Sequence, residues 1–74
     1  MSSIGRILGK IVRSRGDFHP SGQSALYVAR RLDVNDPAAA RTVLKHIATT
    51  ERATAEAAET VAELAEAALA ELDA

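Results

Sequence analysis

Residues 33–37 read Asp33-Val34-Asn35-Asp36-Pro37, and this stretch divides the chain into two differently built parts. Asp36 is a good helix N-cap, and Pro37 suits the first helical position, where its missing N–H costs no hydrogen bond. No glycine or proline follows Pro37, and alanine, glutamate and other good helix formers predominate from there onward. We therefore predict a helix that begins at residue 37.

The predicted helix extends over residues 37–72 as one amphipathic rod of about 54 Å, at 1.5 Å per residue. Its apolar residues recur at heptad spacing, and glutamates occupy the opposite face. The polar stretch from Thr49 to Thr54 interrupts the apolar stripe, so a bend there is the main alternative. Ten of the chain's 16 alanines follow residue 50, beside only three leucines and one valine. Because alanine buries little apolar area, we expect this stripe to be covered by another chain.

The chain before residue 33 predicts two shorter helices, so the expected fold class is all-α. Helical spacing of apolar residues indicates one helix over residues 3–14 and another over residues 23–32. The glycine- and proline-containing segment between them is typical of a loop, and we expect Phe18 to pack back into the core. Gly5 and Gly9 are four residues apart, which allows another helix to cross closely.

We interpret residues 1–34 as a small helical anchor unit and residues 35–74 as a docking helix, within a single domain overall. The chain has 74 residues and no cysteine, so neither a disulfide nor a thiolate metal site can stabilise it. Only 19 of its 35 apolar residues are larger than alanine. So few large apolar residues form only a small hydrophobic core, which favours stabilisation by a partner or by a second copy of the chain.

The composition also bears on location. No apolar run approaches the roughly 20 residues that a transmembrane helix needs. Arg6, Lys10 and Arg13 interrupt the apolar residues of the N-terminus, unlike in a secretory signal peptide. We expect a soluble intracellular protein or a component of a macromolecular assembly. An organelle transit peptide, which the acid-free first 16 residues resemble in composition, is the alternative.

Charge is divided unevenly along the chain. Residues 1–46 carry eight Lys and Arg against three acids, whereas residues 47–74 carry one Arg against seven acids. This separation indicates polar partners, or antiparallel or head-to-tail self-association. The basic first helix could contact nucleic acid, a membrane surface or an acidic protein.

Nothing in the sequence predicts catalysis, a cofactor or a metal site. His19 and His46 have no carboxylate or nucleophile at a motif spacing. Asp17 with His19 lacks the further ligand that a metal would need, and no glycine-rich phosphate loop is present. We therefore expect a non-enzymatic protein.

The leading hypothesis is a structural or assembly protein that docks, in the manner of a coiled coil, onto copies of itself or onto a larger protein scaffold. Minor components of virus particles and secretion machines have this character. The predicted protein interface comprises Val43, Leu44, Ile47, Ala57, Ala58, Val61, Leu64, Ala65 and Leu72, with Ile4, Ile7, Leu8 and Ile11 as a second contact.

Two other functions stay open. Residues 23–46 are similar in element lengths to the helix-turn-helix of DNA-binding proteins, which would make Arg30, Arg31, Arg41 and Lys45 nucleic-acid contacts. However, Asp33 replaces the usual glycine of the turn, and the second helix opens without long side chains that could read bases. The third hypothesis is a regulator or inhibitor whose acidic helix binds a basic protein.

Overall fold

The computed structural model describes residues 3–54 and 59–74, and their regular structure is entirely helical. Helix α1 spans Ile4–Arg15, α2 spans Pro20–Asp33, α3 spans Pro37–Ala53 and α4 spans Glu59–Asp73. The prediction of an all-α fold is confirmed. Among the described residues, no helix is long and apolar enough to cross a bilayer.

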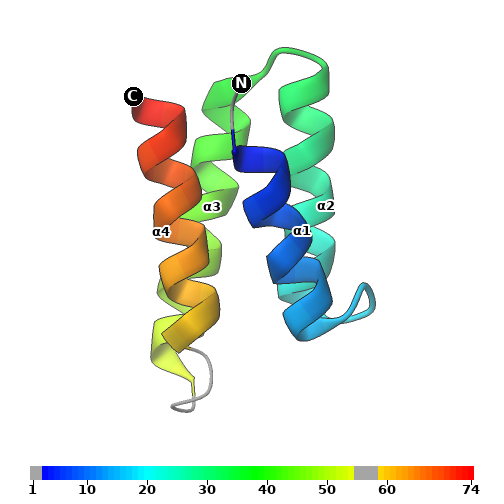
Figure 1. The fold of residues 1–74 in the computed structure, drawn as a ribbon, viewed down its shortest axis with the longest axis vertical. Helices are drawn as coiled ribbons and strands as arrows, with labels where there is room; N and C mark the ends of the chain where they lie inside the picture. Colours follow the sequence, from blue (N-terminus) through cyan, green and yellow to red (C-terminus); the bar gives the residue numbers. More distant parts are fainter. Residues whose placement is uncertain (1–2, 55–58) are drawn as a thin grey trace.

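The helices run alternately up and down in a bundle of 32 × 23 × 20 Å (Figure 1). Each helix packs against its two neighbours around the bundle, so α1 contacts α2 and α4, and α3 contacts the same two helices. Both chain termini lie at one end, and the α1–α2 loop lies at the other (Figure 1). The acidic α4 therefore stands between two helices that carry basic residues.

One hydrophobic core fills the space between the four helices, and α4 contributes small residues to it. The largest fully buried side chains come from every helix, which means that the two units predicted from the sequence share a single core. The buried apolar residues of this cluster are Ile4, Leu8, Ile11, Ala25, Val28, Ala40, Leu44, Ile47, Ala48, Val61, Ala65 and Ala68.

The prediction of one long helix over residues 37–72 is wrong. Helix α3 ends at Ala53, Thr54 has an extended backbone, and α4 returns antiparallel to α3. The Thr54 hydroxyl donates to the carbonyl of Glu51 at 2.9 Å and closes the end of α3. The alternative prediction is a bend between Thr49 and Thr54. The helix is continuous from Thr49 to Ala53, so the break occurs at Thr54, the last residue of that range. Chain reversal lets the alanine-rich stripe be covered within the same chain.

The second helix begins earlier than the sequence predicts, at Pro20. His19 is its N-cap, because Nδ1 of the imidazole accepts a hydrogen bond from the Ser21 amide at 3.1 Å. Proline is well tolerated at the first helical position that follows. The expectation that Phe18 packs into the core is wrong, since this side chain is 91% exposed.

The turn between α2 and α3 confirms the helix start predicted at Pro37. Asn35 adopts a positive φ of 60°, a conformation that asparagine tolerates well. The Asp36 carboxylate then accepts a hydrogen bond from the Ala39 amide at 3.3 Å, which satisfies a free donor of the first turn. Local capping chemistry thus fixes the residue at which α3 begins.

Candidate functional site

The residues predicted to form an interface lie mostly inside the bundle. The buried members are Leu44, Ile47, Val61, Ala65, Ile4, Leu8 and Ile11, and the half-buried members Val43, Leu64, Leu72 and Ile7 pack against them. Ala57 and Ala58 lie outside the described residues. The premise that the C-terminal stripe must be covered by another chain is therefore corrected, because α1 and α3 cover it. A docking surface has to be sought among residues that remain accessible.

Ion pairs within the chain neutralise part of the charge separation seen in the sequence. The Arg52 guanidinium of α3 binds the Glu66 carboxylate of α4, with Nε 3.3 Å from one carboxylate oxygen. Arg41 pairs with Asp73 at the other end of the same two helices. Both pairs are about half exposed and each contributes little free energy, yet together they favour α4 on this side of α3.

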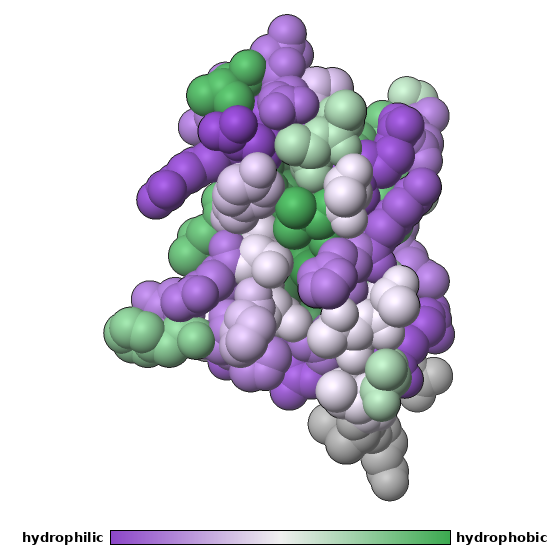
Figure 2. Space-filling view, turned by 180° about the vertical axis from the view of Figure 1, so that it is seen from behind, coloured by the Kyte–Doolittle hydropathy of each residue, from purple (hydrophilic) through white to green (hydrophobic). Residues whose placement is uncertain are grey.

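The residues predicted to contact nucleic acid are only partly available. Arg41 is engaged with Asp73, and Arg31 is 3.8 Å from the Asp36 carboxylate and 5.4 Å from the centre of the Tyr27 ring. Arg30 and Lys45 are exposed. The face opposite to that in Figure 1, where α2 and α3 lie nearest, shows a narrow hydrophobic strip among hydrophilic side chains (Figure 2). It is not a continuous basic surface.

A buried polar cluster joins three helix ends at one end of the bundle. The Glu51 side chain of α3 is only 2% exposed. Its carboxylate accepts hydrogen bonds from the Arg15 guanidinium at the end of α1, with Nε at 3.1 Å, and from the Ser21 hydroxyl at the start of α2. The cluster therefore ties α1, α2 and α3 together where the α1–α2 loop closes.

The donors around Glu51 keep its carboxylate ionised. Burial by itself raises the pKa of Glu51, but the hydrogen bonds from Arg15 and Ser21, with the positive charge of Arg15, hold that pKa below its ordinary value. The hydrogen bond to Glu51 likewise raises the pKa of Arg15. A carboxylate held by donors in this way is a poor general base.

Sequence reasoning missed this cluster, although a signal was present. Glu51 falls on the apolar stripe of its helix, where it stands out as a polar interruption. A charged residue on a buried face requires a partner, and Arg15 supplies it from 36 positions away. The described residues contain no group of three or more His, Cys, Asp or Glu side chains that could hold a metal ion.

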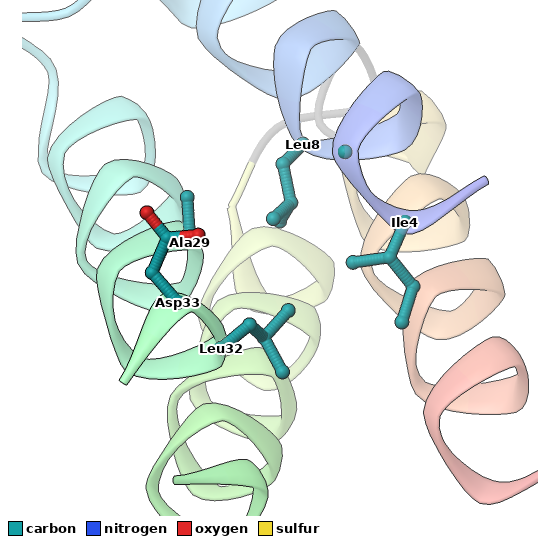
Figure 3. A pocket seen from close by; sticks show the side chains of 6 residues that line it. Ile4, Leu8, Ala29, Leu32 and Asp33 are labelled. Carbon is teal, nitrogen blue, oxygen red and sulfur yellow. The ribbon is translucent and has the colours of Figure 1, made fainter. Parts of the chain in front are cut away.

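An open apolar groove runs between α1 and α2. One hollow, of about 370 Å³, is lined by Ile4, Gly5 and Leu8 of α1 and by Ala29, Leu32 and Asp33 of α2. In Figure 3 the side chains of Leu8 and Leu32 point into the space between these helices. A second hollow of about 340 Å³ shares Gly5, Leu8 and Ala29 with the first, so the two form one groove. Gly9, Val12, Arg13, Ala25 and Leu26 line its continuation.

The two glycines of α1 are not required by the packing of the chain itself. A Cβ atom at Gly5 would have no neighbour within 4 Å, and one at Gly9 would meet only the Arg13 guanidinium, at an ordinary 3.6 Å. Each glycine within a helix costs about 1 kcal/mol relative to alanine. The chain thus tolerates two destabilising residues in the α1 wall of the groove, where the absence of side chains keeps the groove open.

We expect Gly5→Ala to stabilise the fold by up to about 1 kcal/mol, since the methyl group enters free space and alanine favours the helix. Urea denaturation of the variant and the unchanged chain at pH 7 measures the difference. Ser14→Ala, at an exposed position of the same helix, controls for a general effect of alanine. A loss of stability in Gly5→Ala would show that the glycine is needed inside the monomer.

Comparison with protein-family models, curated proteins and solved structures finds no match to this chain. The groove and the cluster around Glu51 therefore have to be interpreted from their own geometry.

Proposed function

We propose that the chain is a non-enzymatic protein-docking module, a small helical subunit that receives a partner in the groove between α1 and α2. The observation that carries this proposal is the pair of glycines on the groove wall. They weaken α1 without serving the packing of the chain, and they leave room for another backbone to approach closely.

The surroundings of the groove favour a protein partner of acidic character. Leu26, at the groove margin, is 45% exposed and offers apolar area to a bound chain. Arg13 lines the groove, and Arg6 and Arg30 are exposed on the same two helices. None of these arginines forms an ion pair with another residue in the described part of the chain. Their charge is thus free to attract acidic side chains.

The other two hypotheses have less support. Nucleic-acid binding through residues 23–46 would require Arg41 to leave Asp73, and the acidic α4 lies directly beside α3. A regulator that acts through its acidic helix would likewise draw on Glu66 and Asp73, which already pair with α3. We keep both as alternatives that binding experiments can separate.

Site-specific photo-crosslinking in the cells that produce the protein tests the docking function. A photoreactive residue in place of Leu26 is expected to capture a defined protein, identified by mass spectrometry. The same residue at Thr49, exposed on α3, serves as the control position. Adding Gly9→Leu, which fills the groove, should abolish the adduct at position 26. Equal yields at both positions, or an adduct indifferent to Gly9→Leu, would contradict the proposal.

A further inference from the structure

We infer that the occupant of the α1–α2 groove is the outer face of α4 from a second copy of this chain, so that copies join head to tail. This inference rests on the proposed docking function and names the partner. It follows from the chemistry of two surfaces that the same chain exposes on different sides of the bundle.

The groove has the shape to receive a helix of small residues, and Arg13 at one end favours an acidic side chain there, away from Asp33 at the other end. Gly5, Gly9 and Ala29 line it with the smallest side chains, and small residues allow helix axes to approach closely. Its lining extends along α1 from Ile4 to Arg13, about 15 Å at the rise of an α-helix. Two to three turns of a partner helix fit that length.

Helix α4 presents a complementary surface to solvent. Glu63, Ala67 and Ala70 are exposed and recur at intervals of four and three residues, so they form one stripe. Beyond Glu63 this stripe carries only alanine methyl groups, which allow another helix to approach closely. Glu63 has no ion-pair partner among the described residues. Its carboxylate is therefore available to a cation of another molecule.

Charge selects this pairing over a symmetric one. If two copies met groove to groove, Arg6, Arg13 and Arg30 of one copy would face the same arginines of the other, which is unfavourable. Placing α4 against the groove instead brings Glu63 toward Arg13, an attractive arrangement. Because α4 does not adjoin α2 in the bundle, the donor and acceptor surfaces of one chain differ. Association is then heterologous, and the open head-to-tail arrangement that we infer continues past a dimer.

Sedimentation equilibrium of the full chain tests the inference. The weight-average mass is expected to rise with concentration past that of a dimer in about 0.01 M salt, where the Debye length is about 30 Å. In about 1 M salt, where it falls to about 3 Å, association should weaken at least several-fold. Arg13→Glu and Glu63→Lys should each weaken it about ten-fold or more. Both positions are exposed, so neither change should unfold the chain.

Mixing the two variants is the sharpest test. Each variant alone brings like charges together at the contact between α4 and the groove, whereas in the mixture every contact between the two variants pairs opposite charges. The mixture is therefore expected to recover association past a dimer. Ala38→Ser, at an exposed position of α3, is the matched control and should leave association unchanged. A chain that stays monomeric at every concentration, a self-limiting dimer of the unchanged chain, or association that resists both substitutions would overturn the inference.

These outcomes are distinguishable from failure of the docking function itself. A monomeric chain that still crosslinks at position 26 to a different protein, in a manner that Gly9→Leu abolishes, would refute the second-copy occupant and retain the docking module. A monomeric chain with no such adduct would refute both.

Discussion

Replacing Gly22 with alanine is expected to destabilise the fold by about 3 kcal/mol. A Cβ atom at Gly22 would lie 2.0 Å from the carbonyl oxygen of Gly16 and 3.0 Å from its carbonyl carbon. Both neighbours belong to the backbone, so relief requires the α1–α2 loop to move as a whole. Overpacking of this kind typically costs about 1–3 kcal/mol, and a backbone clash falls at the upper end.

The loop has little freedom to move away. The Gly16 amide donates to the Val12 carbonyl at 2.6 Å, and the Gly16 carbonyl accepts from the His19 amide at 3.2 Å. Gly16 itself has φ of 90° and ψ of 151°, a combination that side chains of L residues rarely adopt. Shifting this turn would also displace Ser21 and Arg15, and thus the hydrogen bonds to Glu51.

Thermal and urea denaturation of Gly22→Ala measure the loss. A core in a chain of this size supplies no more than about 3–5 kcal/mol, so a loss of about 3 kcal/mol should leave the variant only marginally stable. Gly5→Ala is the matched control, because the same substitution enters open space there and should stabilise the chain. If both variants melt like the unchanged chain, the loop does not pack against α2 as described.

Sequence reasoning succeeded where the signal was local. The start of α3 depends on Asp36 and Pro37, which act on the first helical turn, and the structure confirms it. The start of α2 was misplaced by three residues, because its N-cap is His19 and histidine is not among the residues that commonly cap helices. The all-α fold class followed from helix propensity and apolar periodicity alone.

The long helix failed because periodicity cannot show where a chain reverses. Apolar spacing is much the same in one rod and in two helices that fold back on each other. The polar interruption at Thr50 and Glu51 indicated a break, but the helix continues to Ala53, since Arg15 and Ser21 stabilise the Glu51 carboxylate inside the bundle. Those partners come from the first third of the chain, and no local pattern links them to α3.

The sequence indicated that another helix could approach α1 closely, but it could not show where the groove lies. The spacing of Gly5 and Gly9 predicts close approach of another helix, and within the chain no atom approaches either glycine closely. Only the placement of α1 relative to α2 shows that the glycine side of α1 remains open. The accessible surface of a small bundle depends on helix rotation, which sequence periodicity defines only coarsely.

The acid stability of the chain should depend on Glu51. Because the folded pKa of Glu51 lies below its ordinary value, the unfolded chain takes up this proton at a higher pH than the folded chain does. The resulting stabilisation is present in full above the ordinary carboxyl pKa of about 4.3 and is lost as the pH falls through the folded pKa. From pH 7 to about 5, Glu51 contributes no pH dependence.

We therefore expect Glu51→Gln to cost about 2 kcal/mol at pH 7 and much less at pH 3. Removing one partner of a buried ion pair costs about 3–5 kcal/mol, but the Arg15 side chain is 25% exposed and water can solvate it, which reduces the penalty. Glutamine preserves the shape of the side chain and keeps an oxygen that can accept the hydrogen bond from Ser21. It removes the negative charge that attracts the Arg15 guanidinium. Below the ordinary carboxyl pKa the unchanged chain loses the stabilisation that its ionised Glu51 provides, because the unfolded chain binds the proton more readily, and the difference narrows.

Urea denaturation of both chains at pH 7, 5 and 3 provides the measurement. Glu63→Gln is the matched control, because its carboxylate is exposed and its loss should change stability by less than about 0.5 kcal/mol at every pH. A difference between Glu51→Gln and the unchanged chain that stays constant from pH 7 to 3 would mean that Glu51 acts through its shape alone. If the variant is as stable as the unchanged chain at pH 7, the Arg15–Glu51 ion pair does not stabilise the packing of α1 against α3. A difference in unfolding free energy that decreases from pH 7 to pH 3, in contrast, requires a charged, buried carboxylate that is stabilised by donors from two other helices.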